Sequence, residues 1–449
     1  MTIRISSLFN ALLVTTSCIL GGEIATAHAT STPNQEIPSS LIEQGHYQAV
    51  LGDCMACHSA PGRPTYSGGF PFPLPIGTIY STNITPDPEH GIGTYSEADF
   101  ARAVRQGIRK DGSTLYPAMP FPSYARLSDA DIHALYVYFH NGVKPQAIAP
   151  PENKIMWPLS MRWPLIIWRW LFAPNVQKAQ QRTAAEFSDP VLARGAYLVE
   201  GAGHCGACHT PRGITMAEKA QTAQDGNAFL AGGSVVEGWF IPSLRQENRT
   251  GLGRWSEQDI VDFLKTGRAP TGASFGGMTP VVEHSTHGYS DSDLHAIARF
   301  LHQLTPADPH EQPWQYSPQT ASALQHADLS ARGAQVYIDR CAACHRTDGH
   351  GYGTVFPPLA GNPVVMTADP SSVVHIVQSG ATIQPLPTSV SAFTMPSFGK
   401  TLSDREIADV VSFIRQAWGN QAAPVSEQKV KQLRETMPES TPPSKLPKN

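Results

Sequence analysis

Three stretches of the chain carry apolar residues at helical spacing, and each begins next to a serine. The stretches LSDADIHALYVYFHNG, YSDSDLHAIARFLHQL and LSDREIADVVSFIRQAW span residues 127–142, 289–304 and 402–418. Ser128, Ser290 and Ser403 each have an acidic residue three positions later, as at the N-terminus of a helix, and Ser403 with Glu406 makes a full capping box. The pattern therefore predicts three amphipathic helices that are capped by these serines.

A similar helical pattern lies upstream of each of these helices, and a short cysteine motif ends it. These lead-in segments span residues 41–58, 192–209 and 329–345. Between each motif and its closing helix stands a methionine beside proline or glycine, in YPAMPFPS, FGGMTPVV and FTMPSFG. The chain thus repeats one plan three times: helix, cysteine motif, loop, methionine, helix.

The N-terminus has the composition of an export signal. Arg4 precedes the apolar run LFNALLVTTSCILGG, and small-residue cleavage sites follow at residues 25–27 and 27–29. A membrane anchor is the alternative, but the run is short for a bilayer span. We expect residues 1–29 to be removed as a signal peptide, together with Cys18.

The six other cysteines all lie in the motifs CMACH, CGACH and CAACH. Residues i, i+3 and i+4 of a helix share one face, so the two thiols and the imidazole of each motif point towards the same bound group. C-x-x-C-H is the attachment signature of c-type haem. The predicted thioether cysteines are Cys54, Cys57, Cys205, Cys208, Cys341 and Cys344, and the predicted iron ligands are His58, His209 and His345. Zinc binding, which would need further ligands, and disulfide exchange are the weaker alternatives.

The repeat gives the three methionines a role. Met119, Met278 and Met395 stand at equivalent places, and His/Met ligation is the electron-transfer arrangement of cytochromes c. A methionine in the last iron position argues against chemistry on oxygen or peroxide. His284 and His287 follow Met278 closely and compete with it as ligands of the second iron.

These features predict a mainly α fold made of three tandem class I cytochrome c-like haem domains. A chain of 449 residues has room for about three domains of roughly 150 residues. The expected parts are a signal peptide (1–29), haem domain 1 (38–150), a linker and interface region that contains many tryptophans (151–187), haem domain 2 (188–305), a linker (306–327), haem domain 3 (328–420) and a polar tail (421–449). The net charge of −4 gives no basic surface for nucleic acid.

Residues 155–174 (the Trp-rich segment below) carry four of the eight tryptophans: Trp157, Trp163, Trp168 and Trp170. Pro164 suits the first turn of a short helix. Prolines and the charges of Arg162 and Arg169 interrupt the segment too often for it to span a bilayer. Trp with Arg is typical of a membrane interface or of a partner surface. A buried strut between the first two haem domains is the alternative interpretation.

Several longer stretches resemble a known family. GTIYSTNITPDPEHGIG, YPAMP, WPLSMRWPLIIWRWLFAP, GHCGACHTPRG, GLGRWSEQDI, FGGM, FPPLAGNPVV and FIRQAWGN are similar to the triheme cytochrome c subunit of membrane-bound dehydrogenases of acetic acid bacteria and their relatives. These dehydrogenases oxidise alcohols, gluconate, sorbitol or fructose. The resemblance covers about residues 40–435 and implies the haem cysteines, histidines and methionines named above.

The resemblance also implies the partners. The chain is expected to take electrons from a flavoprotein or quinoprotein catalytic subunit, with a small third subunit in some complexes, and to pass them to ubiquinone. It would then lie on the periplasmic face of the inner membrane, attached peripherally, and would itself transfer electrons without oxidising the substrate. The stretch CGACHTPRGITMAEKA slightly favours a gluconate-type partner. A free periplasmic shuttle and a peroxidase-like multihaem enzyme are the alternatives.

Overall fold

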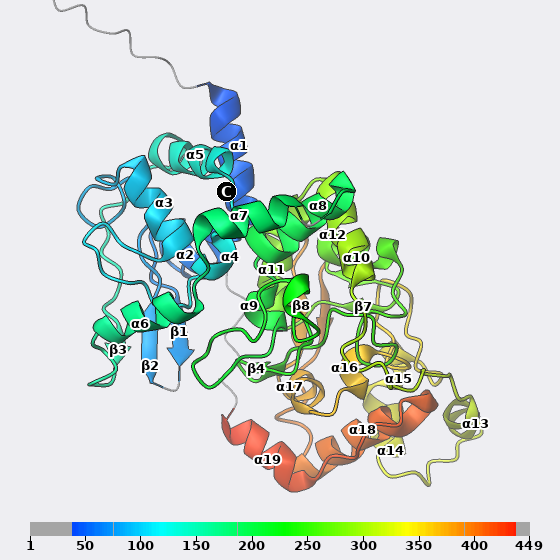
Figure 1. The fold of residues 1–449 in the computed structure, drawn as a ribbon. Helices are drawn as coiled ribbons and strands as arrows, with labels where there is room; N and C mark the ends of the chain where they lie inside the picture. The colour runs from blue at the N-terminus through cyan, green and yellow to red at the C-terminus, as the bar shows by residue number, and fades with distance from the viewer. Residues whose placement is uncertain (1–37, 75, 186, 390, 437–449) are drawn as a thin grey trace, which may run out of the picture. The chain divides into compact units, whose positions relative to one another are not determined.

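The computed structural model of the protein describes residues 38–74, 76–185, 187–389 and 391–436. The predicted signal peptide and residues 437–449 of the predicted tail lie outside these ranges. The described chain is mainly α, which confirms the expected fold class (Figure 1). Strands in the described ranges form short antiparallel ladders. We call the parts that hold the three cysteine motifs the first, second and third repeats.

In each repeat the lead-in helix packs against the closing helix. The pairs are α1 (Ser39–Leu51) with α5 (Asp129–Val137), α8 (Pro190–Ala196) with α12 (Asp291–Gln303), and α14 (Ala334–Arg340) with α18 (Asp404–Gln416). Ser128, Ser290 and Ser403 cap the closing helices as predicted, since each side chain accepts the backbone N–H three residues on. The Ser403–Glu406 capping box is complete. The pattern of the sequence therefore located these helix starts correctly.

A glycine lies at each of the three helix crossings. A Cβ added to it would lie within 2.0–2.2 Å of a backbone oxygen of the closing helix; the pairs are Gly45 with Ala134, Gly195 with Ala296, and Gly333 with Asp409. Real Cβ atoms do not come so close to an oxygen. The two helices of each repeat can therefore cross at this distance only because a glycine stands there, within α1 and α8 and immediately before α14.

The repeats also contain other helices, short ladders and single turns. The helices are α3 (Glu97–Gln106), α4 (Phe121–Tyr124), α10 (Glu257–Thr266), α11 (Met278–His284), α16 (Pro363–Met366) and α17 (Ser371–Ser379). The ladders are β1 (Pro71–Leu74) with β2 (Gly77–Tyr80) and β3 (Lys154–Ile155), β4 (Val235–Val236) with β5 (Trp239–Phe240), β6 (Arg268–Ala269) with β7 (Gly272–Ala273), and β8 (Ala381–Ile383) with β9 (Phe393–Met395). Single π or 3₁₀ turns are η1 (Tyr138–Gly142), η2 (Tyr197–Ala202), η3 (Ala223–Asp225), η4 (Thr286–Gly288) and η5 (Ala417–Gly419).

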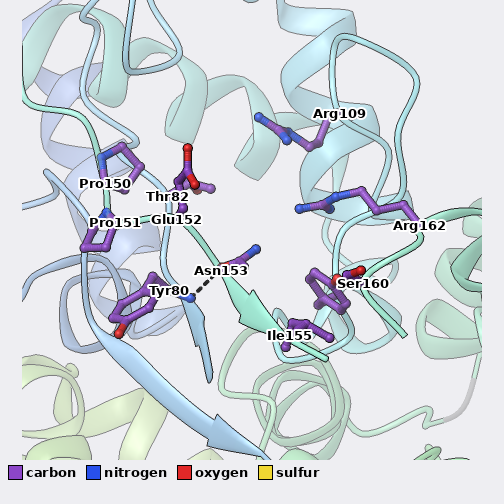
Figure 2. A pocket seen from close by; sticks show the side chains of 11 residues that line it. Tyr80, Thr82, Arg109, Pro150, Pro151, Glu152, Asn153, Ile155, Ser160 and Arg162 are labelled. Atoms are coloured by element: carbon purple, nitrogen blue, oxygen red, sulfur yellow. Dashed lines mark hydrogen bonds between the residues drawn. The ribbon is translucent and has the colours of Figure 1, made fainter. Parts of the chain in front are cut away.

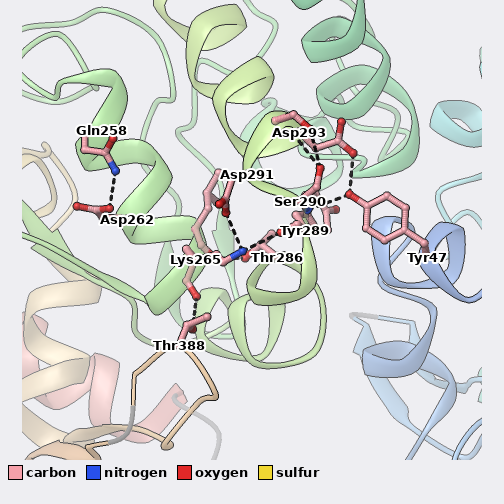
Figure 3. Close-up of polar contacts among 12 residues, drawn as sticks. Tyr47, Gln258, Asp262, Lys265, Thr286, Tyr289, Ser290, Asp291, Asp293 and Thr388 are labelled. Atoms are coloured by element: carbon pink, nitrogen blue, oxygen red, sulfur yellow. Dashed lines mark hydrogen bonds and ion pairs between the residues drawn. The ribbon is translucent and has the colours of Figure 1, made fainter.

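The first and second repeats share one apolar core, whose buried residues run from Ala49 to Leu304. Polar bonds cross between them as well. Tyr47 of α1 donates to Asp293 of α12 at 2.7 Å, as Figure 3 shows, and the Tyr289 hydroxyl donates to the Leu51 carbonyl at 2.7 Å. These two repeats are therefore tightly packed against each other.

The third repeat has a core of its own, which extends from Ala321 to Leu433. It includes α13 (Gln319–Gln325) from the segment predicted as a linker and α19 (Glu427–Thr436) from the predicted polar tail. The third repeat touches the second through Thr388, whose hydroxyl donates to the Lys265 carbonyl at 3.0 Å (Figure 3). The linker and tail segments thus contribute to the packing of the third repeat.

The Trp-rich segment forms α6 (Trp163–Phe172), with Pro164 in its first turn as predicted, and α7 (Val176–Ala185) follows. No side chain of α6 is buried, and Trp157 and Trp170 are each 80% exposed. The buried-strut interpretation is therefore wrong. Among the described residues, no helix has the length and apolarity needed to cross a bilayer.

We predict that Gly45→Ala lowers the free energy of unfolding by about 1–3 kcal/mol, because the added methyl group collides with the Ala134 carbonyl and forces the helices apart. Thermal denaturation followed by circular dichroism measures the change. Gly213→Ala is the matched control, since its Cβ would meet only the Ala217 oxygen at 3.9 Å. Equal stabilities for the two variants would contradict the role of the crossing.

Candidate haem-binding sites

The three cysteine motifs fold as single helical turns: α2 (Cys54–His58), α9 (Gly206–His209) and α15 (Ala342–His345). All six motif cysteines are unpaired, so each sulfur is available for a thioether bond. Within the described ranges, no three His, Cys, Asp or Glu side chains come together as a zinc site would require.

The first thiol of each motif is unsuited to disulfide exchange as the structure stands. Burial raises the pKa of Cys54, Cys205 and Cys341 to about 12. A thiol that attacks disulfides needs a pKa lowered towards neutrality, because the thiolate is the nucleophile. These cysteines are therefore protonated at neutral pH and lack the property that thioredoxin-like chemistry requires.

Each motif histidine is oriented by one backbone carbonyl in a downstream loop. Nδ1 lies 2.7 Å from the oxygen in the first repeat and 2.9 Å in the other two; the pairs are His58 with Thr82, His209 with Pro242, and His345 with Pro357. A carbonyl oxygen can only accept, so Nδ1 carries the proton in all three rings. The lone pair is then on Nε2, which is the tautomer that binds a metal ion.

The environment keeps these imidazoles neutral. Burial lowers the pKa of His58, His209 and His345, and the hydrogen bond to the carbonyl opposes this effect only in part. A neutral imidazole with a fixed ring orientation and a free Nε2 is what an axial iron ligand needs. The three histidines therefore suit the role that the sequence predicted for them.

The third repeat shows the components of a haem site around one cavity. Cys341, Cys344 and His345 line one part of it, and Met395, the last residue of β9, lines another. Most of the remaining wall is apolar and includes Phe356, Leu359, Ile376, Val410 and Ile414. An apolar cavity with two thiols, an imidazole and a thioether fits the flat macrocycle of haem c and its two axial ligands.

The other two predicted methionines lie in loops or at helix starts. Met119 precedes α4 and packs, partly buried, against the same apolar cluster as Cys54. Met278 is the first residue of α11 and is also partly buried. Of the competing histidines, His287 has its Nδ1 on the Val282 carbonyl, which leaves Nε2 free as in the motif histidines, and Nε2 of His284 is buried without a hydrogen-bond partner, so both keep a nitrogen for iron. The assignment of the second iron ligand stays a prediction.

The first and second motifs lie close together. Helix α11, which begins at Met278, contacts α2. Burial raises the pKa of Cys57, and the nearby Asp53 and Cys208 reinforce the shift. Asp53 is itself buried beside Cys54, with a left-handed backbone (φ 49°) and a pKa held well above its usual range by burial. The two sites are therefore neighbours across the shared core.

A separate polar pocket lies beside the first site, between Thr82 and the Trp-rich segment (Figure 2). The guanidinium groups of Arg109 and Arg162 point into it from one side, and Asn153 and Ile155 lie at its base. Arg162 also donates to the Thr114 carbonyl at 2.9 Å. Thr82 links this pocket to the first site, because its carbonyl accepts the bond from His58.

Some of these residues could be found from the sequence and others could not. Pro357, whose carbonyl is bonded to His345, lies in FPPLAGNPVV, one of the stretches that carry the family resemblance. The carbonyls of Thr82 and Pro242 were missed, since a backbone oxygen has no residue signature. Arg109 and Arg162 were not recognised as a pair because they are far apart in the chain.

Comparison with known proteins agrees with this geometry. The family model for cytochrome c matches residues 330–418. The chain is 51% identical to the alcohol dehydrogenase (quinone) cytochrome c subunit of Komagataeibacter europaeus, over 96% of this chain and 91% of that protein. It is 51% identical to the gluconate 2-dehydrogenase cytochrome c subunit of Pantoea cypripedii, over 93% of this chain and 94% of that protein.

A more distant relative is the fructose dehydrogenase cytochrome subunit of Gluconobacter japonicus, which is 33% identical over 95% of this chain and 89% of its own length. Relatives of this kind extend over all three repeats, and each motif histidine has the same hydrogen bond from Nδ1 to a loop carbonyl. The chain therefore belongs to the family of cytochrome c subunits of alcohol, gluconate and fructose dehydrogenases.

Proposed function

We propose that this chain is a triheme electron-transfer subunit that accepts electrons from a dehydrogenase catalytic subunit and delivers them to ubiquinone at a membrane surface. The observation that carries the proposal is the threefold recurrence of a neutral histidine whose Nδ1 is held by a loop carbonyl beside two free thiols. Haem c, when bound there, supplies one-electron transfer.

The protein's own residues would attach, orient and insulate the cofactor. The six motif cysteines would form thioethers, and His58, His209 and His345 would be the proximal ligands. Met119, Met278 and Met395 would complete the coordination, and Met395 lines the same cavity as its histidine, which supports this role in the third repeat. A thioether in the last position raises the reduction potential and leaves no open site for substrate.

The partner is proposed from the relatives. They are named as subunits of alcohol, gluconate or fructose dehydrogenases. We infer a periplasmic catalytic subunit, a flavoprotein or quinoprotein, that oxidises an alcohol, polyol or sugar acid, with a small third subunit in some complexes. Each oxidised substrate would yield two electrons, which this chain would pass on one at a time.

The Trp-rich segment supports attachment to the surface of the inner membrane. Its exposed apolar side chains are Met156, Trp157, Leu159, Met161, Trp163, Ile166, Ile167, Trp170 and Leu171. So many exposed apolar residues in one segment indicate an interaction surface. Tryptophan at this density, with Arg162 and Arg169 beside it, is typical of the boundary between lipid and water.

The polar pocket beside the first site is suited to a quinone head group. Quinone reduction takes up two electrons and two protons, and the carbonyl oxygens of the ring accept hydrogen bonds. Arg109 and Arg162 offer donors, and solvent at the open pocket offers protons. Ile155, Ser160 and Arg162 belong both to the pocket and to the Trp-rich segment, so a lipid-soluble quinone would reach the pocket along that segment.

We predict that replacing Met119, Met278 or Met395 singly by Leu lowers the reduction potential of one haem and opens that haem to carbon monoxide, because the thioether ligand is lost. Spectroelectrochemical titration and carbon monoxide difference spectra measure both effects. If Met278→Leu changes neither property while the other two variants do, His284 and His287 are the ligands to test next.

We also predict that mutations can distinguish the role of the polar pocket from the role of the exposed apolar surface. Arg109→Gln should lower the rate of quinone reduction with both membrane ubiquinone and a water-soluble short-chain quinone, by about tenfold, because it removes a donor from the pocket. The double variant Trp163→Ser, Trp170→Ser should lower only the rate with membrane ubiquinone. Trp168 is left intact, since its Nε1 donates to the Thr215 carbonyl and its ring contacts Phe121.

Val191→Ser, an exposed apolar residue outside the Trp-rich segment, is the matched control and should change neither rate. Haem content is measured in every variant by absorbance. Full quinone reduction by Arg109→Gln and by the double Trp variant, at normal haem content, would contradict the proposed route to quinone.

A further inference from the structure

The cavity of the third haem site is completed by the second repeat. Four residues at the β6–β7 hairpin line it: Arg268, Ala273, Ser274 and Phe275. Arg268 and Ala273 are paired across the hairpin. The third repeat therefore supplies the covalent and axial ligands, but part of the wall and one cation come from its neighbour.

Arg268 is a buried cation without an anionic partner. Its side chain is 6% exposed, its Nη2 donates to the Ser391 carbonyl at 2.7 Å, and its Cζ lies 4.1 Å from the centre of the Phe393 ring. Its Nε is buried and has no hydrogen-bond partner. No carboxylate forms an ion pair with it in the described part of the chain.

Such an arrangement is unfavourable unless something else compensates the charge. A buried guanidinium loses its hydration, and one carbonyl with one aromatic face replaces only part of it. Arginine does not escape by losing its proton, because its pKa is too high. A buried cation in the wall of a cofactor cavity, with a donor unused, indicates that the cofactor brings the missing anion.

Haem carries two propionate carboxylates on its edge. A carboxylate that enters the cavity beside Arg268 would use the free Nε–H and neutralise the guanidinium, in the charge-assisted geometry that arginine favours. The Phe393 ring and the Ser391 carbonyl, which contact the guanidinium, hold it in place and carry no net charge.

Two hydrogen bonds hold the second repeat against the third repeat near Arg268. Glu283 of α11 accepts the backbone N–H of Gln384 at 2.9 Å, close after β8, and Thr388 donates to the Lys265 carbonyl at 3.0 Å. These bonds join the second repeat to the segment that connects β8 and β9, and β9 ends in Met395. Arg268 thus has a fixed position relative to strand β9, which carries the predicted axial methionine.

We propose that Arg268 of the second repeat binds a propionate of the third haem and raises the reduction potential of that haem. The proposal rests on the proposed function only in requiring a haem at Cys341 and Cys344. The direction follows from charge: the oxidised iron centre has one more positive charge than the reduced one, so a nearby cation disfavours oxidation.

The test is a spectroelectrochemical titration of the full, haem-loaded chain with Arg268→Gln and, as a second neutral variant that keeps more of the side-chain volume, Arg268→Met. The step that belongs to the third haem is the one that moves in Met395→Leu. We expect each neutral variant to lower that potential by at least about 59 mV, which corresponds to a tenfold change in the one-electron equilibrium constant. Arg268→Lys should keep most of the potential.

Arg332→Gln is the matched control, because Arg332 is a mostly exposed arginine of the third repeat and should leave the potential unchanged. An unchanged third potential in whichever neutral variant folds would overturn the proposal, as would an equal shift in Arg332→Gln. An intact mass that lacks the third haem in the unmutated chain would instead refute the proposed function, so the two failures can be distinguished.

Discussion

The close crossing of two helices at a glycine is the constraint on which each repeat depends. Gly45, Gly195 and Gly333 lie where the lead-in helix meets the closing helix, with no room for a Cβ. The cysteine motif follows soon after the lead-in helix, with only η2 between them in the second repeat, so this crossing helps to fix the position of the two thiols and the imidazole. The loop that follows then needs to place only one carbonyl opposite Nδ1 to set the orientation of the ring.

The three repeats are joined in two different ways, and the difference bears on electron transfer. The first and second repeats share one core, and their motif thiols lie close enough for Cys208 to influence the pKa of Cys57. The third repeat keeps a separate core, but a hairpin of the second repeat enters the wall of its cavity. Trp239 of the second repeat also stacks on His375 of the third, with ring centres 3.8 Å apart. Consecutive repeats are thus in direct contact in the described chain.

Much of the fold could be predicted from the sequence because local signals carry it. The serine caps, the helical spacing of apolar residues and the five-residue cysteine motifs each depend on residues close together in the chain. The carbonyl partners of the histidines could not be found in this way, since they lie 24, 33 and 12 residues from His58, His209 and His345. Because these loops differ so much in length, the hydrogen bond between histidine and carbonyl that recurs in the structure cannot be recognised in the sequence.

The other features could not be predicted because they depend on packing between residues that are far apart in the chain. Nothing near Arg268 in the chain indicates that it faces the cavity of a different repeat. The residues that line the polar pocket with Arg109 come from four separate stretches of the first repeat and the Trp-rich segment. Segments 306–327 and 421–436 look polar because only a few of their side chains are apolar. Those few, including Leu324 and Leu433, are buried in the third core.

The central claim is that one structural plan holds a covalent haem in each of three repeats. The intact mass of the purified mature protein, measured under denaturing conditions, tests it most directly, because thioether-linked haem stays with the chain. The account predicts a mass equal to that of the processed polypeptide plus three haems. A mass with two haems or fewer, in protein that is fully folded and expressed with haem-attachment machinery, would contradict it.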